Sequence, residues 1–115
     1  PILPSPMPRL RQLVLYKPAA DGKQAPLGTR SEIIKTLAPF NTAPDGSGDT
    51  TIAFGPGFTV QFPLSDARDD INQCLIAIIE EEIAVSVLLR ICKNTAWALL
   101  DPDSGRVFGQ QPAHP

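Results

Sequence analysis

One apolar stripe near the end of the chain constrains the fold more than any other feature of the sequence. Within residues 83–93, apolar side chains recur at the spacing of one face of an α-helix. The stripe consists of Ile83, Ala84, Val87, Leu88, Ile91 and Cys92. A helix with such a face must bury it against another element. The stripe therefore predicts a helix that packs on the rest of a small domain.

The segment before this helix, residues 65–82, admits two interpretations. Helical spacing continues upstream through Ile71, Cys74, Leu75, Ile78 and Ile79. A single long helix would then place a glutamate of residues 80–82 in its apolar seam. In the alternative, which we favour, residues 73–79 form a central strand that is apolar on both faces. The three glutamates then begin a new helix, where the helix dipole favours anions.

The remaining elements follow from shorter patterns. Thr29 and Glu32 have the spacing of a capping box, which predicts a short helix that ends before Pro39. Residues 10–17, 96–100 and 106–108 read as strands. Asn94 is expected to adopt the left-handed conformation that ends the second helix.

A hairpin is expected at residues 50–62, around Gly55, Pro56 and Gly57. We expect the buried side to consist of Ile52, Phe54, Phe58, Val60 and Phe62. The solvent-facing side is expected to consist of Thr51, Thr59 and Gln61.

These elements predict a single small α+β domain over residues 10–108 in the order β-α-β-β-β-α-β-β. The expected sheet is mostly antiparallel, or else mixed, with two helices packed against it. The chain has 115 residues, of which 43% are hydrophobic and 19% charged, as in ordinary globular domains. Residues 1–9 are proline-rich and are expected to be an extended tail, and residues 109–115 a disordered one.

Charge and hydropathy argue against two classes of partner. Twelve acidic and ten basic residues are scattered without a basic stripe, so nucleic acid is not expected to bind. No apolar run approaches the roughly 20 residues of a membrane helix, so we expect a soluble protein outside the membrane. No secretory leader pattern is present, which makes the cytoplasm the default location, although a leader that had been removed would leave no trace.

The sequence offers few catalytic parts. Its single histidine, His114, is next to the last residue, so a Ser-His-Asp or Cys-His site would depend on a tail. Cys74 and Cys92 lie within apolar patterns and are expected to be reduced, buried and inert. With one histidine and two cysteines far apart, neither a metal nor a cofactor is expected.

Two functional hypotheses remain. The leading one is a non-enzymatic protein that binds another protein, as an adaptor, regulator or immunity-type protein, or that self-associates as a homodimer through short exposed strands. Tyr16 and Trp97 are candidate contact residues, although their strand positions favour core packing. The alternative is an enzyme or small-ligand binder that uses an acidic cluster at the start of the second helix. Its candidate residues are Glu80, Glu81, Glu82 and Asp49, with Arg68 or Arg90 as anion contacts.

Overall fold

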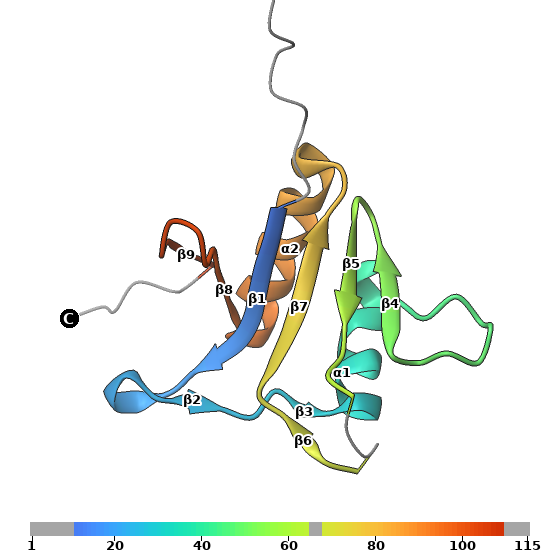
Figure 1. The fold of residues 1–115 in the computed structure, drawn as a ribbon, viewed down its shortest axis with the longest axis horizontal. Coiled ribbons are helices and arrows are strands. Elements are labelled where there is room, and N and C mark those ends of the chain that lie inside the picture. Colours follow the sequence, from blue (N-terminus) through green and yellow to red (C-terminus); the bar gives the residue numbers. More distant parts are fainter. Residues whose placement is uncertain (1–10, 65–67, 110–115) are drawn as a thin grey trace, which may run out of the picture.

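The structure is a computed structural model that describes residues 11–64 and 68–109 (Figure 1). Its elements, in chain order, are β1 (Arg11–Pro18), η1 (Ala20–Gly22), β2 (Gln24–Ala25), β3 (Gly28–Thr29), α1 (Arg30–Leu37), η2 (Ala38–Phe40), β4 (Ile52–Gly55), β5 (Phe58–Gln61), β6 (Asp70–Ile71), β7 (Gln73–Ile78), α2 (Glu81–Thr95), β8 (Ala98–Leu100) and β9 (Val107–Phe108).

The main sheet has the strand order β4-β5-β7-β1-β8-β9, and every neighbouring pair is antiparallel. The short strand β2 pairs with the end of β1, and β3 pairs with β6 in a separate two-stranded sheet. The predicted α+β class, with a mostly antiparallel sheet and two helices, is thus confirmed, and the predicted order agrees with the order of the longer elements. Strands β2, β3 and β6 were not predicted, because two residues are too few to show an alternating pattern.

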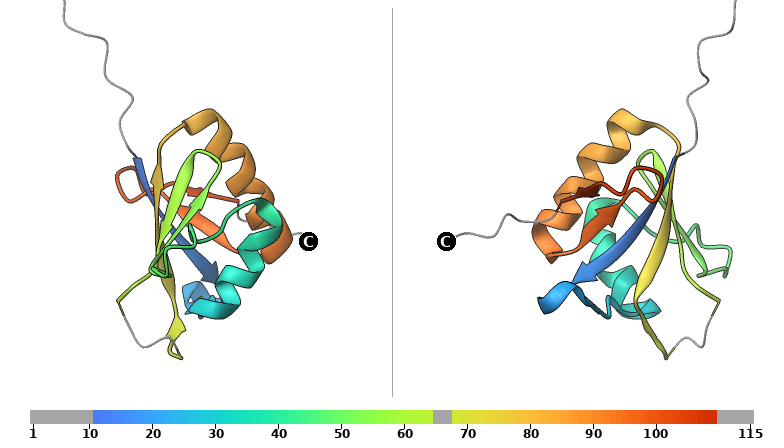
Figure 2. Two further views of the ribbon diagram at one scale, coloured as in Figure 1. Left: turned by 90° about the vertical axis from the view of Figure 1, so that its right-hand side faces the viewer. Right: turned by 60° about the vertical axis from the view of Figure 1, so that its left-hand side comes forward.

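Both helices lie on the same side of the main sheet, so the domain has two layers (Figure 2). The core fills the space between these layers. Strand β1 contributes Leu13 and Leu15, and α2 contributes Leu88 and Ile91, all at most 4% exposed. The stripe that predicts α2 therefore packs against the sheet, as its helical period requires.

The first helix begins as its capping box predicts. The Oγ1 atom of Thr29 accepts a hydrogen bond from the amide of Glu32 at 3.3 Å, and a carboxylate oxygen of Glu32 accepts one from the amide of Thr29 at 2.9 Å. These reciprocal bonds pair amides that the first helical turn leaves without intrahelical partners. The helix then buries Ile33 and Leu37 against the core.

A strand and a separate helix form residues 73–95, which confirms the break favoured over one long helix. The carbonyl oxygen of Gly57 stabilises the reversal, because it accepts hydrogen bonds from the amides of Ile79 and Glu80 at 2.7 and 2.9 Å. The helix ends two residues later than predicted. Its left-handed residue is Ala96, at φ 62°, while Asn94 remains helical and its side-chain amide donates to the carbonyl of Arg90 at 2.8 Å.

The hairpin forms where it is expected, but the predicted side-chain arrangement of β4 is wrong. Gly55 pairs with Phe58, so the turn has two residues, and Phe54 lies opposite Thr59. The prediction had assumed a three-residue turn, which pairs residue 54 with residue 58. A shift of one residue moves every side chain of a strand to the other face. Ala53 is therefore buried under the helices, and Phe54 is 44% exposed on the opposite side.

Three further expectations concern the ends of the chain and the membrane. The predicted tail of residues 1–9 lies outside the described residues, as does the predicted tail at the other end beyond residue 109. Within residues 11–64 and 68–109, no helix is long and apolar enough to cross a membrane.

Candidate functional site

The face of the main sheet that points away from both helices is the broadest candidate site. Side chains alternate between the two faces of a strand, so residues 13 and 15 of β1 face the helices while residue 14 faces outward. The pairing registers extend this assignment across the sheet. We call the outward surface the open face. It consists of Gln12, Val14, Tyr16, Ile52, Phe54, Gln61, Gln73, Leu75, Ala77, Leu100 and Val107, together with Thr59 and Ala98, which point the same way but are only 8% and 0% exposed.

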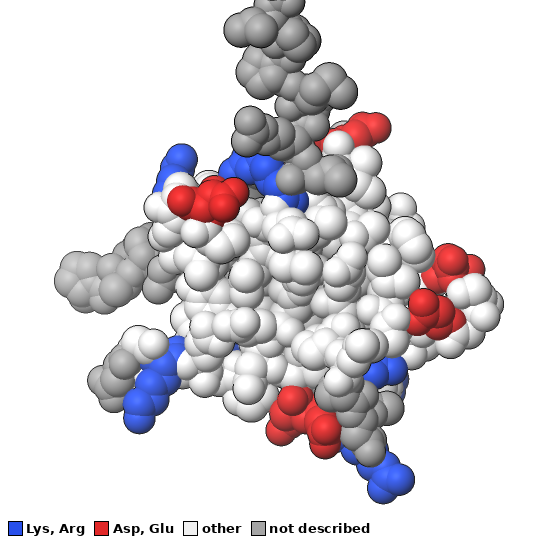
Figure 3. All heavy atoms as spheres, viewed as in Figure 1, with Lys and Arg blue, Asp and Glu red and all other residues white. Residues whose placement is uncertain are grey.

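The open face carries no charged side chain within these described strands. Figure 3 views this face. In the part of it that grey atoms leave visible, charged atoms lie only around the periphery. Its polar side chains are three glutamines, one threonine and one tyrosine. A sheet face in water normally carries polar and charged residues. The open face thus lacks the charged side chains that are typical of a sheet face in water.

A continuous row of mostly apolar residues crosses the middle of the open face. Each residue lies directly opposite the next across a pair of strands, through all strands from β9 to β4. In spatial order the row is Val107, Leu100, Val14, Leu75, Gln61 and Ile52. Directly opposed side chains are in contact distance. The row therefore forms one apolar band, and Val107 at its end is 41% exposed.

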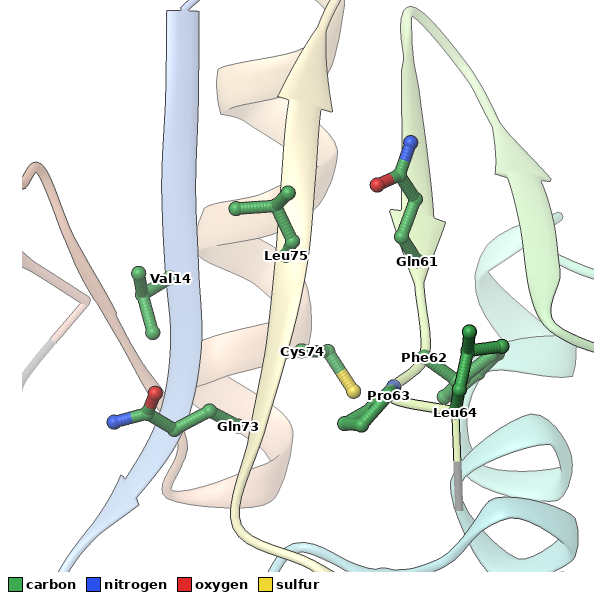
Figure 4. A pocket seen from close by; sticks show the side chains of 8 residues that line it. All are labelled: Val14, Gln61, Phe62, Pro63, Leu64, Gln73, Cys74 and Leu75. Carbon is green, nitrogen blue, oxygen red and sulfur yellow. The ribbon is translucent and has the colours of Figure 1, made fainter.

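A shallow hollow of about 390 Å³ lies in this face between β5 and β7 (Figure 4). The pairing of β5 with β7 ends at Gln61 and Leu75, and the strands separate beyond them. Pro63, which has no amide hydrogen to donate, lies on the rim. The next residue, Leu64, is 90% exposed beside the hollow.

The predicted acidic cluster is dispersed in the structure. Glu80 is the residue before α2, and Glu82 is exposed on its first turn. Glu81 binds the guanidinium of Arg11 at 2.7 Å, and the same guanidinium reaches Asp101 at 3.5 Å. The hydrogen bond that the Arg11 guanidinium donates to Glu81 raises the pKa of Arg11. These contacts join β1 to the start of α2 and to the loop after β8.

Asp101 is a buried polar residue of this region that is not among the predicted site residues. It is 9% exposed, and its carboxylate accepts hydrogen bonds from the amide of Asp103 and the hydroxyl of Ser104, both at 3.0 Å. The bond from the Asp103 amide lowers the pKa of Asp101, with smaller contributions from Ser104 and Arg11. The role of this carboxylate is to hold the turn between β8 and β9.

The other candidate residues of the ligand hypothesis do not line the same hollow as Glu81. Asp49 lies before β4, where its carboxylate accepts a hydrogen bond from the amide of Thr51 at 2.9 Å. That bond and the one from the Thr51 hydroxyl lower the pKa of Asp49. Glu81 lines a hollow of about 210 Å³ between α2 and the sheet, whereas Asp49 lines a separate one beside β4. Neither Arg68 nor Arg90 lines either hollow.

Tyr16 and Trp97 lie in different environments. Trp97, directly before β8, is 5% exposed and belongs to the core, as predicted. Tyr16 is partly exposed on the open face, opposite Ala98 on one side and Gln73 on the other. Of the two candidate contact residues, the structure thus places only Tyr16 on the surface.

Both cysteines are reduced and buried, as predicted. Burial raises the pKa of each thiol to about 12, so the reactive thiolate is scarce at neutral pH. Within residues 11–64 and 68–109, no group of three His, Cys, Asp or Glu side chains is arranged to hold a metal ion.

The open face as a whole was not predicted, although the sequence contains a signal for it. Residues 12, 14 and 16 of β1 and residues 73, 75 and 77 of β7 lack charge, and those are the outward positions. Two helices cover only one face of a sheet of this width, so the second face of these strands had to remain outside.

No protein-family model matches this sequence, and neither a curated protein nor a solved structure matches it.

Proposed function

We propose that the chain is a non-enzymatic protein that binds another protein through the open face. The observation that carries the proposal is an uncharged, largely apolar sheet face on the side of the domain that neither α1 nor α2 covers. The partner surface is of the same kind, broad, apolar and without charge at its centre. A charged partner surface would lose hydration on this face and gain no counter-charge.

The distribution of residue types on this side of the domain supports the proposal. Protein interfaces typically have a core depleted in charge and a polar, solvent-accessible rim. The open face has an uncharged centre, and charged atoms surround it at the periphery (Figure 3). Burial of apolar surface contributes about 25 cal/mol per Å². The exposed side chains of Phe54, Leu64 and Val107 would contribute most, because each has much surface left to bury.

The ligand-binding alternative has less support. It requires the carboxylates to converge on one pocket. Asp49 and Glu81 line different hollows, and Glu81 is already paired with Arg11. We therefore favour protein binding.

We also propose a cytoplasmic location, because reduced cysteines are typical of reducing compartments.

Site-specific photo-crosslinking in the cells that make the protein tests this proposal. A benzophenone amino acid replaces Phe54, which keeps an aromatic group on the open face, and a second variant carries it at Lys35 on α1. We expect a covalent protein adduct from position 54 and none from position 35, because α1 lies on the other side of the sheet. Mass spectrometry identifies the adduct. The proposal is wrong if position 54 gives no protein adduct, or gives the same adducts as position 35.

A further inference from the structure

We infer that the occupant of the open face is a second copy of this chain, packed sheet against sheet in a symmetric dimer. This inference rests on the proposed function and names its partner. Its first support is charge. In a twofold dimer the same patch meets itself, so a charged residue near the axis would face its own like charge. The open face has no charged residue within its described strands, so it meets its own copy without repulsion.

The polar side chains of the open face also suit contact with a copy of itself. Its amide side chains belong to Gln12, Gln61 and Gln73. A primary amide carries two donors and an acceptor, so a glutamine can hydrogen-bond to another glutamine across a twofold axis. Gln73 already donates to the side-chain oxygen of Gln24 at 3.0 Å, which leaves its own oxygen available to accept. These amides can remain hydrogen-bonded when the face is buried.

The shape and area of the open face are sufficient for a dimer. Two copies of one sheet have the same twist, and sheets of equal twist stack about 10 Å apart at about −30°. The strands from β4 to β9 span about 24 Å at a spacing of about 4.8 Å, and the rows of side chains cover about 20 Å along them. Two such faces bury about 1,000 Å² together, which is below the about 1,200 Å² of stable interfaces and is the size of a weak, reversible one. We therefore expect a dissociation constant in the micromolar range.

Mass measurement over a range of concentrations tests this inference. Light scattering on the full chain, from about 1 µM to about 500 µM, brackets a micromolar dissociation constant. We expect the mass to rise from 12.4 kDa toward twice that value. Leu75→Lys places a charge at the centre of each face and is expected to remain monomeric throughout. The matched control is Ile83→Lys, which makes the same change at a residue of α2 that is 47% exposed, and it is expected to dimerise like the wild type.

The other outcomes overturn the inference in distinguishable ways. A wild-type chain that stays monomeric at 500 µM overturns the dimer, and an adduct from position 54 to a different protein would then still support the proposed function. A dimer that survives Leu75→Lys uses another surface. A dimer that is lost in Ile83→Lys but not in Leu75→Lys is built through the helical side.

Discussion

Replacement of Ile76 by lysine is expected to unfold the domain, or to lower its free energy of unfolding by about 4 kcal/mol or more. Ile76 is 0% exposed and points from the central strand β7 into the core beneath the helices. An unpaired charge in such a place costs several kcal/mol, and a domain of this size has only about 5–15 kcal/mol of stability. Loss of the near-ultraviolet circular dichroism signal and of a cooperative urea transition would show this effect.

The neighbouring residue gives the matched control. Leu75 is on the same strand but points to the open face, where a lysine ammonium can reach water. We expect Leu75→Lys to unfold within about 1 kcal/mol of the wild type. Both variants are measured at a concentration where the wild type is monomeric, because dimerisation would add stability. A large loss for Leu75→Lys would mean that the monomer itself covers this face, contrary to the proposed function.

The second large effect is expected in the hairpin. Phe58 is 1% exposed, and its ring packs so closely over Gly55 that a Cβ on that glycine would lie 2.5 Å from it. Truncation to alanine leaves a cavity in the core, which costs about 3–5 kcal/mol for a phenylalanine. The midpoint of urea unfolding is expected to fall accordingly, with an unchanged slope.

Phe54→Ala is the matched control for this variant, because it removes the same ring from the other face of the same hairpin. Phe54 is 44% exposed, so we expect a loss within about 1 kcal/mol. Equal losses for the two variants would support the three-residue turn, which places both rings on one side. The comparison therefore also tests the register of the hairpin.

The sequence predicts those parts of the fold that depend on local patterns. The stripe at residues 83–92 and the capping box of Thr29 and Glu32 each identify a helix, because helical period and capping are set by neighbouring residues. The glutamates at residues 80–82 separate β7 from α2 for a similar reason, since a carboxylate in an apolar seam is costly. These elements, together with the α+β class, are confirmed.

Features that depend on tertiary packing are harder to predict. Residues 54–58 fit a two-residue or a three-residue turn about equally well, and only packing against the helices decides which face is buried. A strand that is apolar on both faces, such as β7, is typical of a sheet covered on both sides. The sequence of β7 alone does not show which of its two faces the helices cover. The same ambiguity is why the pattern of β7 does not by itself predict the open face.

The most direct test of the open face as an interface is an isotope-filtered nuclear Overhauser experiment. Labelled and unlabelled wild-type chains are mixed at about 500 µM, so that only contacts between copies give signals. We expect these contacts from the methyl groups of Val14, Leu75 and Leu100 at the centre of the open face. Contacts between copies that arise only from methyl groups of α1 or α2, with none from these three residues, would contradict the account.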